Sequence, residues 1–250
     1  MINLELIGEG ATTKVYRDGD KAVKLYTNTS FNQVENEARM QSYAAEKGLP
    51  VPKVYGVRQL GENVVALDMQ YISGKHLLHG NMNKDERNTA IQILVKLQCE
   101  VHSINAEGLS KQSNNIIRRI ERNKYIDKSI VNRLLLHIEG LDTTHTNLCH
   151  GDFHPLNIMF DGEKHWIIDW VDMALGNPVA DVCRTYLIFK QFLLRYSGVY
   201  LRCSCKEAGV KEDDVLVWMP VIAAARMSEN MDNKARMFLM RIVNEWSANQ

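Results

Sequence analysis

The sequence predicts an α+β protein in which a small β-rich part is followed by a larger, mainly helical part. Up to about residue 71, apolar residues occur in short runs separated by turn residues, which is typical of strands. Beyond that point, apolar residues recur at helical spacing over long segments. We place the boundary after residue 73, so that the expected parts are residues 1–73 and 74–250.

The β-rich part contains five expected strands and one helix. The strands are expected around residues 4–6, 15–16, 22–26, 53–59 and 63–71. The segment Arg17-Asp18-Gly19-Asp20 is a strong hairpin signal between the second and third strands. A helix is expected over residues 30–47, because Thr29 or Ser30 provides a cap and Gly48 follows its end.

The helical part is interrupted once by short strands. Its expected helices cover residues 83–105, 116–125, 129–141, 182–192, 215–225 and 237–246. Asn83 is the expected cap of the first of these, with Glu86 three residues later. The chain returns to strands at residues 158–160 and 166–168, which flank a turn.

Composition excludes several classes of protein. The 30 basic and 30 acidic residues balance, and no basic tract indicates nucleic-acid binding. No apolar run approaches the roughly 20 residues needed to cross a bilayer, and the N-terminus lacks a leader pattern. Five scattered cysteines favour reduced thiols. We therefore expect a cytoplasmic protein without nucleic-acid or membrane partners.

Three polar residues have the spacing of a phosphotransfer site. Asp152 is followed by Asn157 five residues later and by Asp169 twelve residues after that. One carboxylate would accept the proton of an attacking hydroxyl, while an amide oxygen and a second carboxylate would hold Mg²⁺. The rest of the chain must then supply a nucleotide site.

The β-rich part contains residues suited to binding phosphates. Gly8 and Gly10 form a turn between strands, followed by Val15, in the pattern of a phosphate-covering loop, although Thr13 stands where a third glycine is usual. Lys24 lies in an apolar strand, where an unpaired ammonium would be costly. Of the two nearby carboxylates, we favour Glu37 over Glu35 as its partner.

These motifs together resemble the aminoglycoside phosphotransferase and choline kinase family. The resemblance is carried by Gly8-Glu9-Gly10 through Tyr16, Ala22-Val23-Lys24, Glu37, residues 49–54, Met69 to Gly74, His150 to Asn157, Ile168-Asp169-Trp170, and Gly176-Asn177-Pro178 with Asp181. It implies a bilobal protein-kinase-like fold, with a small antiparallel β N-lobe containing one helix and a mainly helical C-lobe. ATP and Mg²⁺ are the implied cofactors.

The resemblance also implies a role for each matching residue. Asp152 would be the catalytic base, or the group that orients the acceptor hydroxyl, and Asn157 and Asp169 would bind magnesium. Lys24, aligned by Glu37, would hold the α and β phosphates. The remaining nucleotide-binding positions would be Gly8, Gly10, Thr13 and Val15 in the loop, and Gln70 and Ile72 in the hinge.

Two departures from protein kinases favour a small-molecule acceptor. Gly151 stands where regulated protein kinases carry an arginine that pairs with a phosphorylated loop. The segment between Asp169 and Asp181 is also short for a platform that positions a peptide. An atypical Ser/Thr protein kinase and a non-catalytic nucleotide-binding module are the alternatives.

The identity of the acceptor is left open among an aminoglycoside, an amino alcohol and a sugar. An aminoglycoside would require an acidic pocket, but residues 201–250 contain seven acidic and seven basic residues. We expect His150 to support the loop by packing and Asp181 to brace it. The roles of His154 and Asp172 stay undecided between function and structure.

Overall fold

The computed structural model describes residues 5–10 and 13–249, and its elements confirm the α+β class. Leu4, expected in the first strand, and Ala11 and Thr12 of the glycine-containing loop lie outside these residues. The chain forms two compact units, one of residues 1–80 with 155–172 and the other of residues 81–154 with 173–250. The assignment of separate roles to residues 1–73 and 74–250 stays a prediction.

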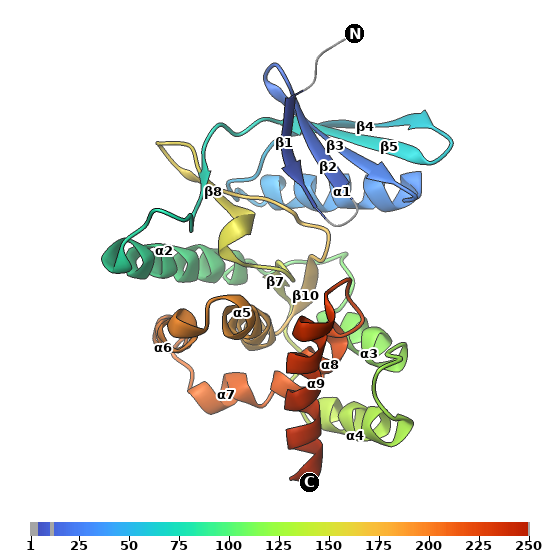
Figure 1. The fold of residues 1–250 in the computed structure, drawn as a ribbon, viewed down its shortest axis with the longest axis vertical. Helices are drawn as coiled ribbons and strands as arrows, with labels where there is room; N and C mark the ends of the chain where they lie inside the picture. Colours follow the sequence, from blue (N-terminus) through green and yellow to red (C-terminus); the bar gives the residue numbers. More distant parts are fainter. Residues whose placement is uncertain (1–4, 11–12, 250) are drawn as a thin grey trace. The chain divides into compact units, whose positions relative to one another are not determined.

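The first unit is built on a five-stranded antiparallel sheet with strand order β1-β2-β3-β5-β4 (Figure 1). Its strands are β1 (Glu5–Glu9), β2 (Thr13–Asp18), β3 (Lys21–Thr27), β4 (Val54–Gly61) and β5 (Val64–Gln70). The expected hairpin between β2 and β3 is confirmed, with Asp18 opposite Lys21 and Gly19 in the left-handed region at φ 63°. All five strands expected in this part of the chain are therefore present.

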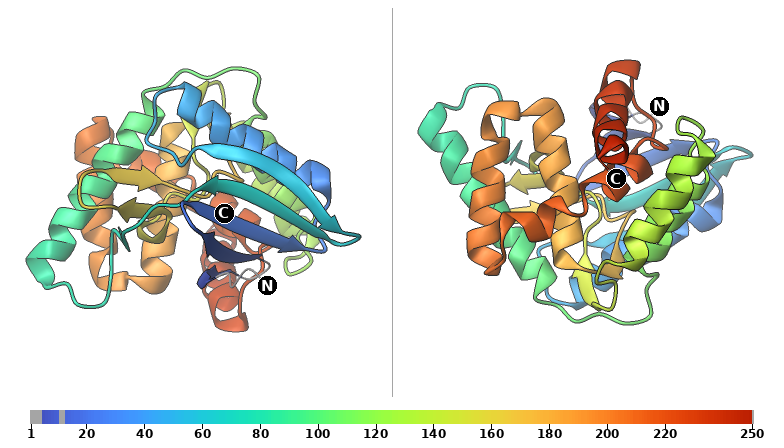
Figure 2. Two further views of the ribbon diagram at one scale, coloured as in Figure 1. Left: turned by 90° about the horizontal axis from the view of Figure 1, so that it is seen from above. Right: turned by 90° about the horizontal axis from the view of Figure 1, so that it is seen from below.

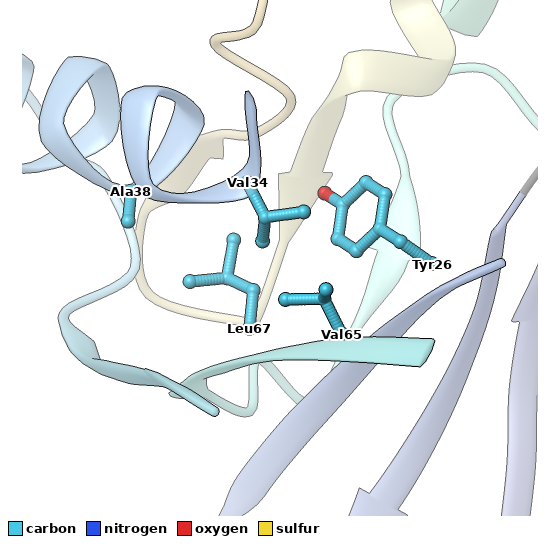
Figure 3. Packing of buried hydrophobic residues seen from close by; sticks show 5 residues of the cluster. All are labelled: Tyr26, Val34, Ala38, Val65 and Leu67. Atoms are coloured by element: carbon cyan, nitrogen blue, oxygen red, sulfur yellow. The ribbon is translucent and has the colours of Figure 1, made fainter. Parts of the chain in front are cut away.

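Helix α1 (Phe31–Glu46) packs against β4 and β5, and Figure 2 shows it along one face of the sheet. Ser30 caps it, and the Gln33 side chain accepts a hydrogen bond from the Ser30 backbone N–H, which completes a capping box. Figure 3 shows the apolar contact between helix and sheet, formed by Tyr26, Val34, Ala38, Val65 and Leu67. Burying a side chain such as Leu67 contributes roughly 1.5–3 kcal/mol, so this contact holds the helix on the sheet.

A second, three-stranded sheet completes the first unit. It consists of β6 (Lys75–His76), β8 (Ile158–Phe160) and β9 (His165–Ile167), and the one-turn 3₁₀ helix η1 (Pro155–Asn157) precedes β8. Gly74 is required next to it, because a side chain there would collide with the backbone of Phe160. Pro50 accepts a hydrogen bond from the Ile167 N–H at 2.8 Å, which ties β9 to the connector after α1.

The second unit is mainly helical. Its helices are α2 (Lys84–His102), α3 (Gln112–Glu121), α4 (Lys128–Glu139), α5 (Pro178–Phe192), α6 (Leu194–Ala208), α7 (Glu212–Leu216), α8 (Met219–Arg226) and α9 (Asn233–Ala248). Strands β7 (Asn147–Cys149) and β10 (Ala174–Gly176) form an antiparallel pair. Helices α5 and α6 lie side by side in Figures 1 and 2. No helix in the described ranges 5–10 and 13–249 is long and apolar enough to cross a bilayer.

The expected cap of α2 is confirmed, since the Asn83 side chain accepts hydrogen bonds from the backbone N–H groups of Asp85 and Glu86. Helix α3 begins and ends about four residues earlier than expected, and α5 begins at Pro178 rather than at residue 182. Asn177 caps α5 and Pro178 occupies its first turn, so the cap and the proline, rather than the apolar periodicity that begins at Val182, mark where the helix begins.

Candidate active site

Lys24, in the first unit, contacts the carboxylates of two residues that are far from it in the chain. It lies on β3 opposite Val15 of β2 and Leu67 of β5. Its Nζ is 2.8 Å from Oε1 of Glu37 and 3.1 Å from Oδ1 of Asp169. The expected pairing of Lys24 with Glu37 is confirmed, and Glu35 on the same helix is exposed.

Glu37 is held by two donors and is almost completely buried. Its second oxygen accepts a hydrogen bond from the Tyr26 hydroxyl at 2.6 Å. Burial alone would lower the pKa of Lys24, but the carboxylates of Asp169 and Glu37 outweigh it and hold this pKa above its ordinary value. Lys24 is therefore a charged ammonium whose position is set by α1 and by the segment after β9.

Asn157 and Asp169 are brought together by the pairing of β8 with β9. Asn157 immediately precedes β8, and its carbonyl accepts a hydrogen bond from the Ile168 N–H at 2.9 Å. Asp169 has a φ of 66°, a left-handed conformation that is uncommon outside glycine but tolerated by Asp. The pairing thus brings the backbone of Asn157 beside the segment that carries Asp169, although the two residues are twelve apart in the chain.

The glycine-containing loop is described except for Ala11 and Thr12. Gly8 lies in β1 opposite Val15, so it belongs to a strand rather than to the turn expected from the sequence. Gly10 donates its N–H to the carbonyl of Thr13 at 2.8 Å and begins the turn. Val15 is the direct neighbour of Lys24 across the β2–β3 pair.

The expected hinge covers Gln70, the last residue of β5, and the two residues after it. The Gln70 N–H donates to the carbonyl of Lys53 at 2.8 Å, and the Tyr71 N–H donates to the backbone carbonyl of Asp20 at 3.0 Å. Ile72 is buried, and no residue in the described part of the chain accepts a hydrogen bond from its N–H. The backbone of Ile72 is thus suited to meeting a polar ligand edge, whereas the Gln70 N–H is already engaged.

In the second unit, Asp152 lies in a loop directly after β7. Gly151 has a φ of 84°, which explains the glycine there, since an arginine in this conformation would be strained. His150 is completely buried, packs edge-on against Phe153, and accepts a hydrogen bond from the Asp152 N–H at Nδ1, 3.2 Å away. The supporting role expected for His150 is therefore confirmed.

Asp181 braces the same loop from helix α5, as expected. Its Oδ1 accepts the Gly151 N–H at 3.0 Å, and its Oδ2 lies 2.9 Å from Nε2 of His102. Burial raises the pKa of Asp181, but hydrogen bonds and charge from His102, with smaller contributions from His150 and Gln98, bring it below its ordinary value. Although His102, Cys149 and Asp181 are close enough to hold a metal, these hydrogen bonds already occupy the carboxylate.

The side chains of Arg184 and His154 contact the Asp152 carboxylate. Arg184 lies 3.0 Å from Oδ1 through its Nη2, and His154 lies 3.3 Å from Oδ2 through its Nε2. Burial alone would raise the pKa of Asp152, but Arg184, followed by His154 and His150, holds it far below its usual range. Asp152 is therefore an ionised hydrogen-bond acceptor near neutral pH, and His154 faces it.

Arg184 and Glu229 are members of this site that the sequence did not reveal. Nη1 of Arg184 lies 2.5 Å from Oε1 of Glu229, so one guanidinium joins two carboxylates. An arginine between Val182 and Leu187 on a buried helical face was the available signal, because such a charge needs partners. The sequence did not predict the partners of Arg184, because Asp152 is 32 and Glu229 is 45 residues away from it in the chain.

Comparison with known proteins identifies relatives at low identity. Residues 3–209 match the family model described as "Phosphotransferase enzyme family". The chain is 25% identical over 185 residues to acyl-CoA dehydrogenase family member 10 of Mus musculus, covering 64% of this chain but only 17% of the mouse protein. The chain therefore corresponds to a small part of that relative.

Solved structures show the same fold. A thermostable mutant of aminoglycoside phosphotransferase APH(4)-Ia, in a ternary complex with AMP-PNP and hygromycin B, has a TM-score of 0.70 and 12% identity, covering 97% of this chain and 92% of that one. A choline/ethanolamine kinase family protein from Mesorhizobium loti has a TM-score of 0.66 and 19% identity, covering 98% and 87%. The fold expected from the sequence is confirmed, and the chain belongs to the phosphotransferase enzyme family.

Proposed function

We propose that this protein transfers the γ-phosphoryl group of ATP to a hydroxyl group of a small molecule, such as an aminoglycoside, an amino alcohol or a sugar. The observation that carries the proposal is the pair of contacts made by Lys24, which is 12% exposed and held between Glu37 and Asp169. A largely buried lysine fixed by a helix carboxylate is suited to binding phosphate oxygens in a fixed place. The similarity to a phosphotransferase solved with AMP-PNP supports ATP as the donor.

Asn157 and Asp169 fit a magnesium ion by their chemistry. Both offer oxygen atoms, which Mg²⁺ prefers, and the hydrogen bond between Ile168 and Asn157 holds their backbones together. When bound, Mg²⁺ would neutralise charge on the phosphates. In this proposal Asn157 and Asp169 are the metal ligands, while Gly8, Gly10, Thr13, Val15, Gln70 and Ile72 contribute to nucleotide binding.

Asp152 acts on the acceptor. Its ionised carboxylate accepts a hydrogen bond from the acceptor hydroxyl and orients the oxygen for in-line attack. As the new oxygen–phosphorus bond forms and the bond to the leaving ADP breaks, the hydroxyl proton passes to the carboxylate. Because Arg184 makes Asp152 a weak base, orientation contributes more than early proton removal.

A small molecule fits the acceptor better than a peptide. Only four residues, Trp170 to Met173, separate Asp169 from β10, and β10 is already paired with β7. This length leaves no segment comparable to the peptide platform of a protein kinase. The acceptor is therefore proposed to be held by side chains rather than along an extended backbone.

The proposal is tested with Asp152→Asn. We expect turnover to fall by about 10²–10⁴, since a positioned acid–base group contributes that much, while Mg-ATP affinity measured by calorimetry stays within about twofold. Phosphorylated products are detected by mass spectrometry after incubation with a panel of hydroxyl compounds and proteins. The exposed Asp213→Asn is the matched control.

Wild-type turnover by Asp152→Asn would show that Asp152 has been assigned the wrong role. Labelling of proteins instead of small molecules would indicate a protein kinase. Retained ATP binding with no phosphorylated product over the whole panel would indicate a non-catalytic module.

A further inference from the structure

Helix α5 holds three successive residues of the loop that carries Asp152. Its Asp181 and Arg184 contact residues 151 and 152, each at 3.0 Å. The third contact comes from Thr185, whose hydroxyl donates to the carbonyl of Phe153 at 2.7 Å. Because residues 181, 184 and 185 are three and four positions apart, they share one face of the helix. This face therefore contacts the loop before, at and after Asp152.

The Thr185 hydroxyl is directed at the loop rather than at its own helix. Thr185 is completely buried, and so is Phe153. A hydroxyl has one hydrogen to donate. The carbonyl of Phe153 at 2.7 Å is a closer acceptor than the carbonyl of Asp181, one turn earlier in α5, at 3.3 Å. The hydrogen bond to Phe153 is therefore the one that Thr185 makes.

Gln98 of helix α2 joins two of the residues that hold the loop. Its Nε2 donates to the Thr185 hydroxyl at 3.2 Å and to Oδ2 of Asp181 at 3.4 Å. Its Oε1 accepts a hydrogen bond from the Tyr200 hydroxyl of α6 at 2.5 Å. All these side chains are buried, so a hydrogen bond that is lost here is not replaced by one to water. The network fixes the Thr185 side chain from the side opposite the loop.

We propose that Thr185 is a positioning residue for phosphotransfer, because its hydrogen bond to the Phe153 carbonyl fixes the backbone that carries Asp152. This inference rests on the proposed function and adds a residue to it. Thr185 contacts the loop and neither the nucleotide nor the acceptor, so it acts through the geometry in which Asp152 meets the acceptor hydroxyl. A displacement of about 1 Å at a reacting group can cost about 10² in rate. Loss of one hydrogen bond to this loop is therefore expected to lower kcat.

The first test compares Thr185→Val with Thr185→Ser. Valine has nearly the shape of threonine but no hydroxyl, so the Phe153 carbonyl loses this donor, whereas serine keeps it. We expect Thr185→Val to lower kcat about tenfold, while KM for the acceptor and the affinity for Mg-ATP stay within about twofold. Thr185→Ser should recover most of the rate. Steady-state kinetics are measured well below the melting temperature of each variant.

Ser197→Ala is the matched control for the loss of a buried hydroxyl. Ser197 is buried in α6, and its hydroxyl donates to the carbonyl of Leu194 in the same helix at 2.8 Å. The substitution should lower the melting temperature and leave kcat unchanged. If Thr185 served stability alone, Thr185→Val would behave in the same way.

The second test measures the loop itself and needs neither nucleotide nor acceptor. The N–H groups of Gly151 and Asp152 donate to Asp181 and His150, so they should exchange slowly with solvent while the loop is held. Hydrogen exchange detected by mass spectrometry follows peptides that contain residues 150–154. Thr185→Val should raise the exchange rate of this segment severalfold, whereas Thr185→Ser and Ser197→Ala should leave it unchanged.

Wild-type kcat in Thr185→Val, or wild-type exchange of residues 150–154 in that variant, would overturn the inference. Equal losses of rate in Thr185→Val and Thr185→Ser would do so as well. If Thr185→Val keeps the full rate while Asp152→Asn is inactive, the inference fails and the proposed function stands. Absence of phosphotransfer by the wild type would count against the proposed function, and the exchange measurement would then decide whether Thr185 holds the loop.

Discussion

The first and second units each contain a network of ion pairs, and the two networks hold groups of opposite charge. In the first unit, Lys24 lies between the carboxylates of Glu37 and Asp169. In the second unit, Arg184 lies between the carboxylates of Asp152 and Glu229, and Arg119 and Arg226 also contact Glu229. We call Arg119, Arg184, Arg226 and Glu229 the arginine cluster. The first network thus fixes a cation between two anions, whereas the second fixes the Asp152 carboxylate through a cation that Glu229 also contacts.

Their protonation behaviour differs in the same way. Lys24 stays protonated because two carboxylates raise its pKa despite burial. The pKa of Asp152 is low because guanidinium and imidazole groups outweigh burial. In both networks, neighbours of opposite charge keep a group ionised. Removing such a neighbour should therefore change the pKa of that group and the activity that depends on it.

The largest effect is expected from Lys24→Met. The substitution removes the cation of the first network and leaves Glu37 and Asp169 facing each other without compensation. Phosphotransfer should fall by about 10³, comparable to loss of a preorganised electrostatic group, and the free energy of unfolding should fall by about 3–5 kcal/mol because buried charge is left unpaired. Steady-state kinetics and urea unfolding measure both. Lys21 is exposed on the same strand, so Lys21→Met should leave both the rate of phosphotransfer and the free energy of unfolding nearly unchanged.

Arg184→Met should have the next largest effect by breaking the link between Asp152 and Glu229. We expect kcat to fall by about 10², as for loss of a group that positions a catalytic residue. The pKa of Asp152 should rise, since Arg184 is the strongest of the groups that lower it. His154, His150 and Arg226 remain in the variant and should limit this rise. Activity of the variant should therefore be lost at a higher pH than activity of the wild type as the solution is acidified.

The pH dependence of kcat distinguishes this role from a purely structural one. An unchanged pH profile together with a normal kcat would contradict the positioning of Asp152 by Arg184. Arg184→Lys should restore part of the rate, and Arg195→Met, exposed at the start of α6, is the control for loss of an arginine.

The smallest expected effect concerns stability in acid. Asp181 is buried and its folded-state pKa is lowered, so its ionised form stabilises the fold above the unfolded-state pKa of about 3.9. This contribution is lost as the pH falls below about 4 towards the folded-state pKa. Urea unfolding of the wild type between pH 6 and 3 should therefore show a decline that is shallower in Asp181→Asn. Equal slopes would mean that Asp181 contributes no linked stability.

Local patterns in the chain predicted much of the fold. The hairpin at Gly19, the cap at Asn83 and the helix after Ser30 depend on neighbours within a few residues, and all three are present. By contrast, β7 and β10 are three residues long and have no periodicity to detect. They become strands because tertiary pairing places one beside the other.

In the candidate site too, contacts between residues close in the chain were predicted and contacts between distant residues were not. The partner of Lys24 followed from the cost of a buried ammonium and from a carboxylate thirteen residues away on the next helix. The arginine cluster could not be predicted from the sequence, because its residues come from α3, α5, the end of α8 and the turn after it. Nothing in the spacing of Arg119, Arg184 and Glu229 marks them as neighbours.

The sequence by itself determined the fold class, the family motifs and the residue types suited to phosphotransfer, because turns, caps and periodicity are properties of short segments. The tertiary structure alone decided that Asp152 is held by Arg184, that Asn157 lies beside the Asp169 segment, and that three arginines share one carboxylate. Electrostatic interactions depend on distance and burial in space, which the order of residues along the chain does not specify.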